Sequence, residues 1–345
     1  MSKTKTGMGV IGAGVWAETH CITYHNAPNA ELVAVCDLVP EKAQALAKKY
    51  GAKKVYTDYR EMLRNPEIEA VAVVTPDFAH KQPAVDAANA GKHVLVEKPL
   101  ATTVADAVEM NEAAKRNHVI LMPDFHNRWN PSFVTAKESI SDGTLGAPRY
   151  VYIRHSNTKY VPFTMLNWSA RSSVLWFLGS HACDLARFIM ESNVVKVYTV
   201  SRKGVLQKAG KDIPDFFTSI LEFENGGVAT VENSWILPDA LPSLGEFRAE
   251  ILCEKGMHNV EFNTSDSCIT YSEQAGRGQL RDLYAQNIVY GRLKGFCYDS
   301  ILHFLDCIQN GASLICDAVD GIENTRTLEA MSRSLEIGQP VQVTR

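Results

Sequence analysis

Two groups of residues have the types and spacing needed for acid/base chemistry. In Glu97-Lys98-Pro99, a carboxylate and a lysine directly follow an apolar, strand-like run. His181 lies three residues before Asp184 in a helix-like stretch, so these two side chains share a helix face. A lysine and an imidazole can exchange a proton with a substrate hydroxyl. Taken singly, a surface ion pair or a buried structural histidine explains each group as well.

A glycine-rich run near the start of the chain is typical of dinucleotide binding. An apolar segment leads into a Gly-x-Gly-x-x-Ala sequence, followed by a helix-like segment over 15–26. Gly12 would allow the tight turn, Gly14 would let the backbone approach a pyrophosphate, and Ala17 would permit close helix packing. The helix N-terminus would face the phosphates. The residues expected to bind the cofactor here are Gly12, Ala13, Gly14, Val15 and Trp16. By itself, such a run can also mark only a turn.

An acidic residue ends the next apolar strand. Asp37 lies 23 positions after Gly14, close to the spacing of about 20 expected of a ribose-binding carboxylate. A carboxylate would accept hydrogen bonds from both ribose hydroxyls and repel a 2′-phosphate, and Leu38, Val39 and Pro40 supply no cation. The sequence therefore predicts NAD rather than NADP. The alternative is an aspartate that caps the next helix.

Composition narrows the class of protein. With 345 residues and 46% hydrophobic residues, the chain can bury two cores, so two domains are expected. A net charge of −4 without a Lys/Arg block argues against nucleic acid or an anionic membrane as partner. There is no apolar run of about 18 residues, and the basic start lacks a separate apolar region. A cytoplasmic protein is expected.

The cysteines do not have metal-ligand spacing. No Cys-x-x-Cys pair occurs, so neither a metal site nor a redox pair is predicted. Free cysteine is usually buried, and these residues are expected to be reduced and structural. The positions are Cys21, Cys36, Cys183, Cys253, Cys268, Cys297, Cys307 and Cys316.

The first third of the chain alternates strand-like and helix-like runs, which predicts a Rossmann dinucleotide-binding domain over 1–123. Its strands are expected at 7–12, 31–37, 53–57, 69–75, 93–97 and 118–122, with helices such as 40–50 and 104–116. Right-handed crossovers bring the carboxyl ends of the strands to one edge, where ligands bind. The fold class is thus α/β followed by α+β.

The second domain, 124–345, contains long alternating runs that predict a large open, mainly antiparallel sheet. The expected strands are 149–156, 194–202, 216–223, 227–236, 247–254 and 258–262, with a hairpin turn at Asn225-Gly226. This domain is expected to bind substrate and to mediate oligomerisation. A wide apolar sheet face commonly packs on another subunit, so a homodimer or homotetramer is predicted.

Two loops emerge at the ligand-binding edge of the first domain. One holds Thr75, Pro76 and His80; the other is Glu97-Lys98-Pro99. Each is punctuated by a proline that ends the strand, and both are expected to contact the cofactor. Together with the glycine-rich start, the acid after the second strand and a later Gly-x-His-x-x-Asp, these motifs resemble the Gfo/Idh/MocA oxidoreductase family.

The resemblance covers nearly the whole chain. The segment 125–131 resembles the family's entry into its second domain, and 304–343 resembles its helix, Asp-Gly turn, second helix and final strand. The resemblance implies an NAD(P)-dependent sugar or polyol dehydrogenase with its catalytic histidine at His181 and a cis Pro99. In the mechanism that follows, hydride passes from a carbinol carbon to nicotinamide, His181 removes the hydroxyl proton and Lys98 hydrogen-bonds the same oxygen.

The chain departs from the family pattern at Phe177, where many members carry an aspartate four residues before the histidine. An aromatic face in place of a carboxylate suits stacking on a sugar ring and leaves Asp184 to orient His181. A glycoside or another less polar sugar derivative is therefore expected rather than a simple inositol or free hexose. The substrate-binding residues predicted are Lys98, Asn127, Trp168, Phe177 and His181.

The function indicated is NAD-dependent oxidation of a secondary hydroxyl of a sugar, polyol or glycoside. Two alternatives stay open at this point. One is an oxidoreductase that retains its cofactor, and either re-reduces its substrates or sets up an elimination through a keto-sugar. The other is a non-enzymatic NAD-binding sensor, which would have no use for Lys98 and His181 as an acid/base pair.

Overall fold

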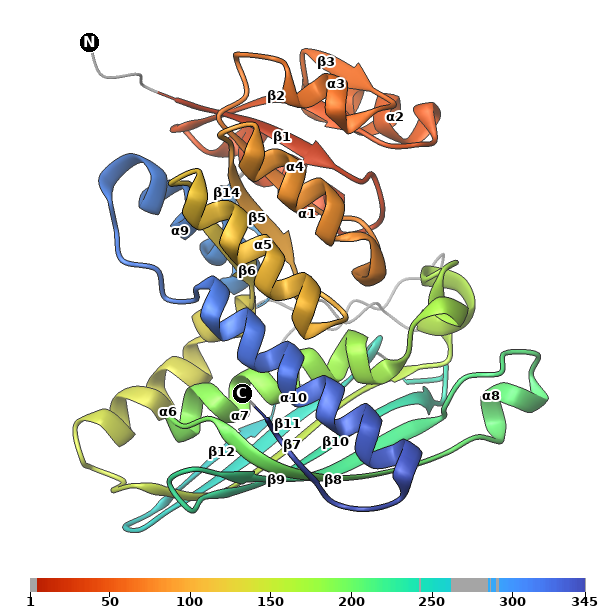
Figure 1. The fold of residues 1–345 in the computed structure, drawn as a ribbon, viewed down its shortest axis with the longest axis vertical. Helices are drawn as coiled ribbons and strands as arrows, with labels where there is room; N and C mark the ends of the chain where they lie inside the picture. The colour runs from red at the N-terminus through yellow and green to blue at the C-terminus, as the bar shows by residue number, and fades with distance from the viewer. Residues whose placement is uncertain (1–4, 242, 262–284, 286, 290–291, 345) are drawn as a thin grey trace. The chain divides into compact units, whose positions relative to one another are not determined.

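The structure is a computed structural model that describes residues 5–241, 243–261, 285, 287–289 and 292–344 (Figure 1). The chain forms two compact units. The first comprises Met1–Trp129 and Ala285–Thr325, and the second comprises Asn130–Tyr284 and Arg326–Arg345. The first unit thus includes a stretch from late in the chain, which a boundary at residue 123 does not anticipate.

A six-stranded parallel sheet forms the centre of the first unit, in the order β3-β2-β1-β4-β5-β6. This is the strand order of a dinucleotide-binding fold, with its switch point between β1 and β4. The strands are β1 (Thr6–Ile11), β2 (Ala30–Cys36), β3 (Lys54–Tyr56), β4 (Ala70–Val73), β5 (His93–Glu97) and β6 (Leu121–Asp124).

Helices cover both faces of this sheet and bury one apolar core against each. One core lies between the sheet and α1 (Ala17–Asn26), α2 (Pro40–Tyr50) and α9 (Phe296–Asn310). The other includes residues of α3 (Tyr59–Leu63), α4 (Lys81–Asn89) and α5 (Val104–Arg116). Nearly continuous apolar strands such as Ala70–Val73 are what a sheet covered on both faces requires.

Local signals explain where the helices of this unit begin and end. Helix α2 has Pro40 in its first turn and ends at Gly51, which adopts a left-handed conformation. The Thr103 side chain caps α5 by accepting a hydrogen bond from the Asp106 amide. These observed bounds equal the predicted 40–50 and 104–116.

A seven-stranded sheet dominates the second unit, in the order β12-β11-β7-β10-β9-β8-β15. All of its neighbouring strands are antiparallel except β7 and β10, which run parallel. The strands are β7 (Pro148–Thr158), β8 (Val194–Arg202), β9 (Phe216–Phe223), β10 (Val228–Leu237), β11 (Gly245–Cys253), β12 (Met257–Glu261) and β15 (Val341–Gln342).

One face of the seven-stranded sheet is covered by helices. Helices α6 (Pro131–Ser141) and α7 (Ser180–Met190) lie on it (Figure 1), and α7 contacts β7 and β10. Apolar residues from the helices and alternate strand positions form a single core. The mainly antiparallel sheet predicted for this part of the chain is confirmed, including the β9–β10 hairpin through Asn225-Gly226.

The predicted Asp-Gly turn near the C-terminus is wrong. Asp320 and Gly321 lie inside α10 (Ala318–Ile337), because Asp317 already begins that helix by accepting hydrogen bonds from the amides of Val319 and Asp320. Gly321 is needed for packing instead: a Cβ there would lie 2.6 Å from a methyl group of Leu100.

The Asp215 side chain accepts hydrogen bonds from the amides of Val205 and Leu206 at the start of α8 (Val205–Lys208). The seven cysteines within the described residues are all free thiols, and Cys268 lies outside them. Among the described helices, none is both long and apolar enough to cross a membrane.

Candidate functional site

The turn between β1 and α1 contains Gly12 and Gly14, and the surroundings of these two glycines differ. Gly12 has φ +101°, and a Cβ on it would lie 2.5 Å from the carbonyl oxygen of Val74. A side chain at Gly12 is therefore excluded by the protein itself. No protein atom of the described residues lies within 4 Å of a Cβ built on Gly14, so the protein leaves this position open.

The neighbouring residues of this turn are accessible. Gly14 and Val15 are exposed, Trp16 is half-buried, and α1 begins at Ala17 with no side-chain cap on its first turn. An open turn before an uncapped helix N-terminus is the arrangement that binds phosphate. Ala13, in contrast, is buried.

The carboxylate of Asp37 ties the glycine-rich turn to the end of β2. Its Oδ2 accepts a hydrogen bond from the Ala13 amide at 2.7 Å, and its Oδ1 accepts from the Val39 amide at 2.8 Å. Asp37 stays half-buried, beside the turn that would carry the pyrophosphate. The position agrees with a ribose-binding acid, and the hydrogen bonds hold its carboxylate in a fixed orientation.

His80 joins the two loops that were predicted to contact the cofactor. Its Nδ1 lies 2.8 Å from the carbonyl oxygen of Pro99, and its Nε2 lies 2.9 Å from that of Thr75. The ring is buried, and burial lowers its pKa. His80 therefore lies between the two loops, and a neutral ring, which carries one N–H, donates to one of these two carbonyl oxygens. Direct contact of His80, Thr75 or Pro76 with the cofactor stays a prediction.

The loop after β5 carries Lys98 beside a buried group of acidic residues. The Lys98–Pro99 peptide bond is cis, as the family resemblance implies. Burial lowers the pKa of Lys98 to about 8, against the opposing negative charges of Glu97, Asp77 and Asp124. A lysine in this range can give or take a proton near neutral pH, which a surface lysine does rarely.

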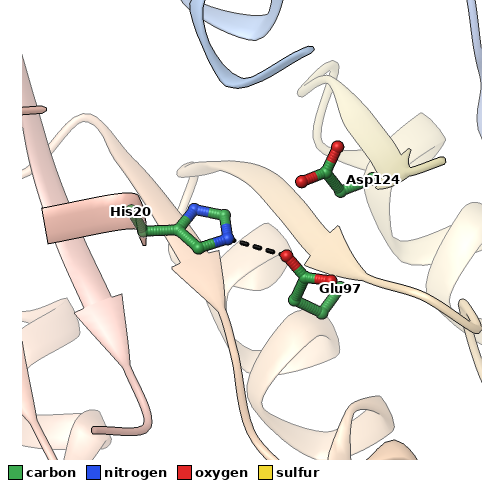
Figure 2. Close-up of side chains that lie close together, drawn as sticks. All are labelled: His20, Glu97 and Asp124. Atoms are coloured by element: carbon green, nitrogen blue, oxygen red, sulfur yellow. Dashed lines mark hydrogen bonds and ion pairs between the residues drawn. The ribbon is translucent and has the colours of Figure 1, made fainter. Parts of the chain in front are cut away.

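Glu97 points away from solvent into a cluster with His20 and Asp124 (Figure 2). The Nε2 atom of His20 lies 2.8 Å from Oε1 of Glu97, and ligand atoms of all three side chains lie within 4.8 Å of one another. His20 and Asp124 were not anticipated from the sequence. The predicted final strand ended at residue 122, so the acid at the carboxyl end of β6 was missed.

The segment after β6 is packed against the return stretch of the first unit. His126 lies between Trp16 and Phe296, with ring centroids 5.4 and 5.8 Å away. Its neighbour Asn127, predicted to bind substrate, is buried in the short helix His126–Trp129. A substrate contact by Asn127 stays a prediction.

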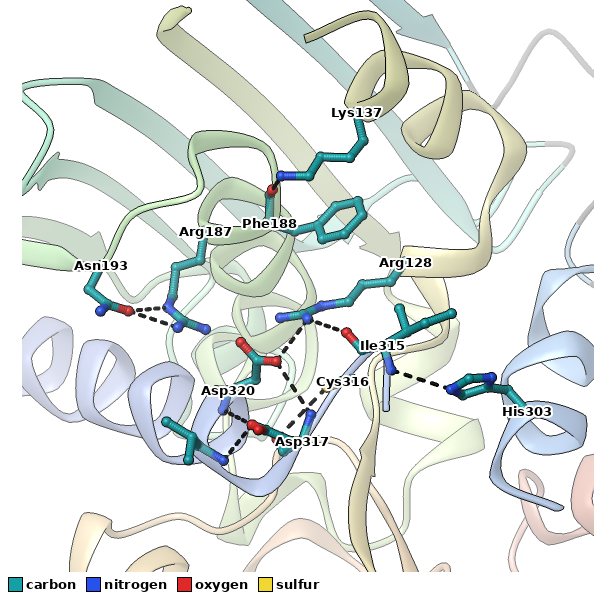
Figure 3. Close-up of polar contacts among 11 residues, drawn as sticks. Arg128, Lys137, Arg187, Phe188, Asn193, His303, Ile315, Cys316, Asp317 and Asp320 are labelled. Carbon is teal, nitrogen blue, oxygen red and sulfur yellow. Dashed lines mark hydrogen bonds and ion pairs between the residues drawn. The ribbon is translucent and has the colours of Figure 1, made fainter. Parts of the chain in front are cut away.

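Arg128 has a structural role in the same segment (Figure 3). One of its guanidinium nitrogens lies 2.9 Å from Oδ2 of Asp320 and donates to the Ile315 carbonyl at 2.9 Å. The Arg128 side chain is 5% exposed. This buried cation fastens the segment after β6 to the stretch that leads into α10.

In the second unit, His181 and Asp184 lie one turn apart near the start of α7, as predicted. Both are buried. A π-helical turn, Leu175–Gly179, precedes α7 and carries Phe177. Such turns are rare and are found frequently at functional sites. An interaction of Asp184 with His181 stays a prediction.

His155 on β7 lies beside His181 and was missed in the sequence. The two imidazole rings have centroids 5.4 Å apart, and His155 stacks on Phe247 with centroids 4.4 Å apart and ring planes at 14°. The stacking fixes the plane of His155. The period-2 pattern of β7 could have revealed it, because His155 follows the buried Val151 and Ile153 on the same face.

Phe177 belongs to a group of aromatic side chains. Its ring centroid lies 6.2 Å from that of Trp168, in an edge-on arrangement, and 5.8 Å from that of Trp235. Phe177 and Trp168 are half-buried, whereas Trp235 is fully buried. An aromatic surface thus stands one turn before His181.

The sheet face under α7 changes from apolar to polar along its length. On β10, Ala229 and Val231 are followed on the same face by Asn233 and Trp235. Two buried atoms there, Oδ1 of Asn233 and Nε1 of Trp235, have no hydrogen-bond partner among the described residues. The same holds for Oδ1 of Asn157, which follows His155 on β7. Buried polar atoms without partners are rare in proteins and need a ligand, water or another explanation.

The residues of the first unit fit NAD. Gly12 supplies the turn, Gly14 leaves space that the protein does not use, and two backbone amides hold the carboxylate of Asp37 beside that turn. Contact of Asp37 with a ribose stays a prediction. Bound NAD would supply a hydride acceptor.

The chain matches two models of one family. Residues 6–125 match "Oxidoreductase family, NAD-binding Rossmann fold", and residues 133–259 match "GFO/IDH/MocA C-terminal domain". The cofactor of this family, NAD, agrees with the acidic Asp37.

Similar proteins include several sugar and polyol dehydrogenases. The chain is 27% identical to myo-inositol 2-dehydrogenase of Thermotoga maritima, over 97% of this chain and 98% of that one. It is 27% identical to D-glucoside 3-dehydrogenase of Escherichia coli, over 99% of each. A crystal structure of GenD2 from gentamicin A biosynthesis in complex with NAD shares the fold, with a TM-score of 0.87, 24% identity and coverage of 100% and 98%. The chain belongs to the GFO/IDH/MocA family of NAD-binding oxidoreductases.

Proposed function

We propose that this protein catalyses NAD-dependent oxidation of a secondary hydroxyl group of a sugar, polyol or glycoside. The observation that carries the proposal is the polar end of the sheet face under α7. There His181 and His155 adjoin, and Asn233 and Trp235 each have a buried polar atom without a partner among the described residues. Ligand hydroxyl groups, which both donate and accept hydrogen bonds, would satisfy such atoms.

The acid/base roles are proposed for Lys98 and His181. His181 removes the proton of the reacting hydroxyl as general base, and Lys98 hydrogen-bonds the same oxygen as it becomes a carbonyl. The lowered pKa of Lys98 also lets it share the proton transfer. In this proposal Asp184 orients the His181 ring. The names of the relatives support a hydroxyl group as the site of oxidation.

The substrate proposed is a glycoside or a similarly less polar sugar derivative. The myo-inositol 2-dehydrogenase of Thermotoga maritima and the D-glucoside 3-dehydrogenase of Escherichia coli are each 27% identical to this chain, so these two relatives do not choose between an inositol and a glycoside. Phe177 and Trp168 favour the glycoside, because aromatic rings stack on the C–H face of a pyranose and Phe177 has no group that could hydrogen-bond an additional hydroxyl.

A substrate panel tests the proposed function. Purified protein and NAD are mixed with inositols, free hexoses, pentoses and alkyl or aryl glycosides, and NADH is followed by its absorbance. We expect a glycoside to give the highest kcat/KM. Oxidation of inositols alone would refute the argument from Phe177, and no oxidation of any compound would refute the enzyme assignment in favour of a sensor.

We also propose that the second unit forms a homodimer or homotetramer through the sheet face that α7 does not cover. On that face Tyr198 and Ile220 are directly paired across β8 and β9 and are 39% and 44% exposed. Adjacent large apolar side chains at the surface are typical of an interface. Light scattering tests this: wild type should be a dimer or larger, and Tyr198→Lys with Ile220→Lys should be a monomer. A monomeric wild type would refute it.

A further inference from the structure

The buried cluster of His20, Glu97 and Asp124 has a geometric origin in the first sheet. Glu97 and Asp124 end the parallel strands β5 and β6 and are direct neighbours in their register. Neighbours in register project from the same face, so the two carboxyl groups must lie close together. Two positions earlier, Leu95 and Met122 belong to the apolar core on that face. The two carboxyl groups therefore lie on the same buried face of the sheet as these apolar side chains.

Helix α1 closes the cluster on this face. His20 is fully buried and its Nε2 lies 2.8 Å from Oε1 of Glu97, while its Nδ1 lies 3.4 Å from the hydroxyl of Tyr24. Burial lowers the pKa of His20 to about 4, so the ring is neutral at pH 7. A neutral ring that donates from Nε2 to Glu97 can accept from the Tyr24 hydroxyl at Nδ1.

Two ionised carboxylates in this position would be unfavourable. Asp124 is fully buried, and neither of its oxygens accepts a hydrogen bond of good geometry within the described residues, although Ser300 and Glu97 interact with it. Burial, together with the charge of Glu97, raises the pKa of Asp124 to about 8. Burial also raises the pKa of Glu97 to about 7, against the opposing charge of Lys98.

We propose that Glu97 and Asp124 share one proton, and that the resulting carboxylic acid–carboxylate pair determines the negative charge that faces Lys98. The pair carries a single negative charge, which balances the ammonium group of Lys98. Its proton lies between one carboxyl oxygen of Asp124 and one of Glu97. His20 and Asp124 are thus positioning residues that act through Glu97.

The charged and titratable groups around the pair come from several elements. Loss of the shared proton gives the pair a second negative charge, which keeps Lys98 protonated to higher pH. The groups that face the pair or Lys98 are His20 and Tyr24 of α1, Trp16 before it, Ser300 of α9, and Asp77 and His80 after β4.

A divalent cation is the competing explanation. One nitrogen and two carboxylate oxygens within 4.8 Å of one another match a set of metal ligands. A proton is favoured because Lys98 already supplies one positive charge beside the two carboxyl groups.

Spectroscopy without substrate tests the shared proton. In wild type, infrared difference spectra between about pH 6 and pH 10 should show one protonated carboxyl band that disappears at high pH. Asp124→Asn should lack the band, since its amide can donate to Glu97 in place of the proton, and Asp86→Asn should keep it. If Asp124→Asn does not fold, carbon NMR of wild type labelled at its aspartate carboxyl carbons should show one carboxyl group with a pKa far above the usual range for aspartate.

Three results would overturn the proposal. One is a wild type without a protonated carboxyl at about pH 6. Another is a band that persists in Asp124→Asn. The third is a stoichiometric divalent metal that remains in wild type after purification with a chelator and is lost in Asp124→Asn.

The effect on catalysis rests on the proposed function and has its own readout. Asp124→Asn should shift the pH dependence of kcat that reports Lys98 to lower pH by about one unit, because the second negative charge no longer forms. An unshifted profile in Asp124→Asn, together with an infrared band that is present in wild type and absent from the variant, would remove the link to Lys98 and leave the shared proton intact. An inactive wild type would refute the proposed function alone.

Discussion

Substitutions at Gly12 and Gly14, in the glycine-rich turn between β1 and α1, allow an effect on protein stability to be distinguished from an effect on cofactor binding. A Cβ at position 12 would lie 2.5 Å from the Val74 carbonyl oxygen. The residue that replaces Gly12 would also have to adopt a backbone φ of +101°. Backbone strain of about 1–3 kcal/mol and overpacking of about 1–3 kcal/mol give a destabilisation of about 4 kcal/mol for Gly12→Ala. For a unit of this size, that loss lowers Tm by about 12 °C.

Gly14→Ala is the matched comparison. A Cβ there meets no atom of the described residues within 4 Å, and Gly14 does not have a left-handed backbone. Its Tm without cofactor should stay within a few degrees of wild type or rise slightly, since alanine restricts the unfolded chain. Because the methyl group would occupy space left for the pyrophosphate, we expect NAD to bind at least about tenfold more weakly.

Thermal unfolding with and without NAD, together with calorimetric titration of NAD, measures both effects. The reasoning would be refuted if Gly14→Ala lowered the Tm of the cofactor-free protein as much as Gly12→Ala does. It would also be refuted if Gly14→Ala bound NAD as tightly as wild type, since the open space at Gly14 would then have no connection with the cofactor.

Three further predictions concern charged side chains. Asp37→Ala leaves the amides of Ala13 and Val39 without their acceptor and removes the proposed acceptor for the ribose hydroxyls. NAD should therefore bind about 10- to 100-fold more weakly, and the preference for NAD over NADP should fall. Unchanged affinities in calorimetric titration would contradict this. Arg128→Ala leaves Asp320 without its buried partner and should destabilise the protein by about 1–3 kcal/mol in urea unfolding, whereas the exposed Arg60→Ala should change it by less than about 0.5 kcal/mol. Equal effects would argue against an anchoring role. The raised pKa of Asp124 means that its contribution to stability is complete below about pH 4 and is lost as pH rises toward 8, so Asp124→Asn should gain stability relative to wild type between pH 5 and 8. A difference that does not change with pH would show that Asp124 is ionised in the folded protein.

Local patterns were sufficient to predict most of the first unit. Strand β5, helix α2 and helix α5 have the predicted bounds, since their apolar periodicity, Pro40 and Thr103 act within a few residues. Gly12, Gly14 and Asp37 were identified because the dinucleotide fingerprint has a fixed spacing along the chain.

What the sequence did not reveal depends on contacts between distant segments. Glu97 and Asp124 are brought together by strand register, and His20 reaches them from another helix, so no local pattern connects the three. The alternation along β7 places His155 on the face of the buried Val151 and Ile153, but its contact with His181 depends on tertiary packing. The return of 285–325 to the first unit likewise depends on tertiary packing, such as α9 against α1.

The proposed roles of Lys98 and His181 can be checked by single substitutions. Lys98→Ala and His181→Ala should each lower kcat by about two orders of magnitude or more, with NAD affinity nearly unchanged. His155→Ala should have a smaller effect, because His155 lies beside His181 but does not transfer the proton in the proposed mechanism.

The most direct test of the central claim is hydride transfer itself. A glycoside or polyol carrying deuterium at the carbon to be oxidised is mixed with excess enzyme and NAD in a single turnover, and the products are examined by mass spectrometry and NMR. We expect a carbonyl compound and NADH that carries the deuterium on its nicotinamide ring, in equal amounts. Tight NAD binding without oxidation of any hydroxyl compound, or NADH that lacks the label, would contradict this claim.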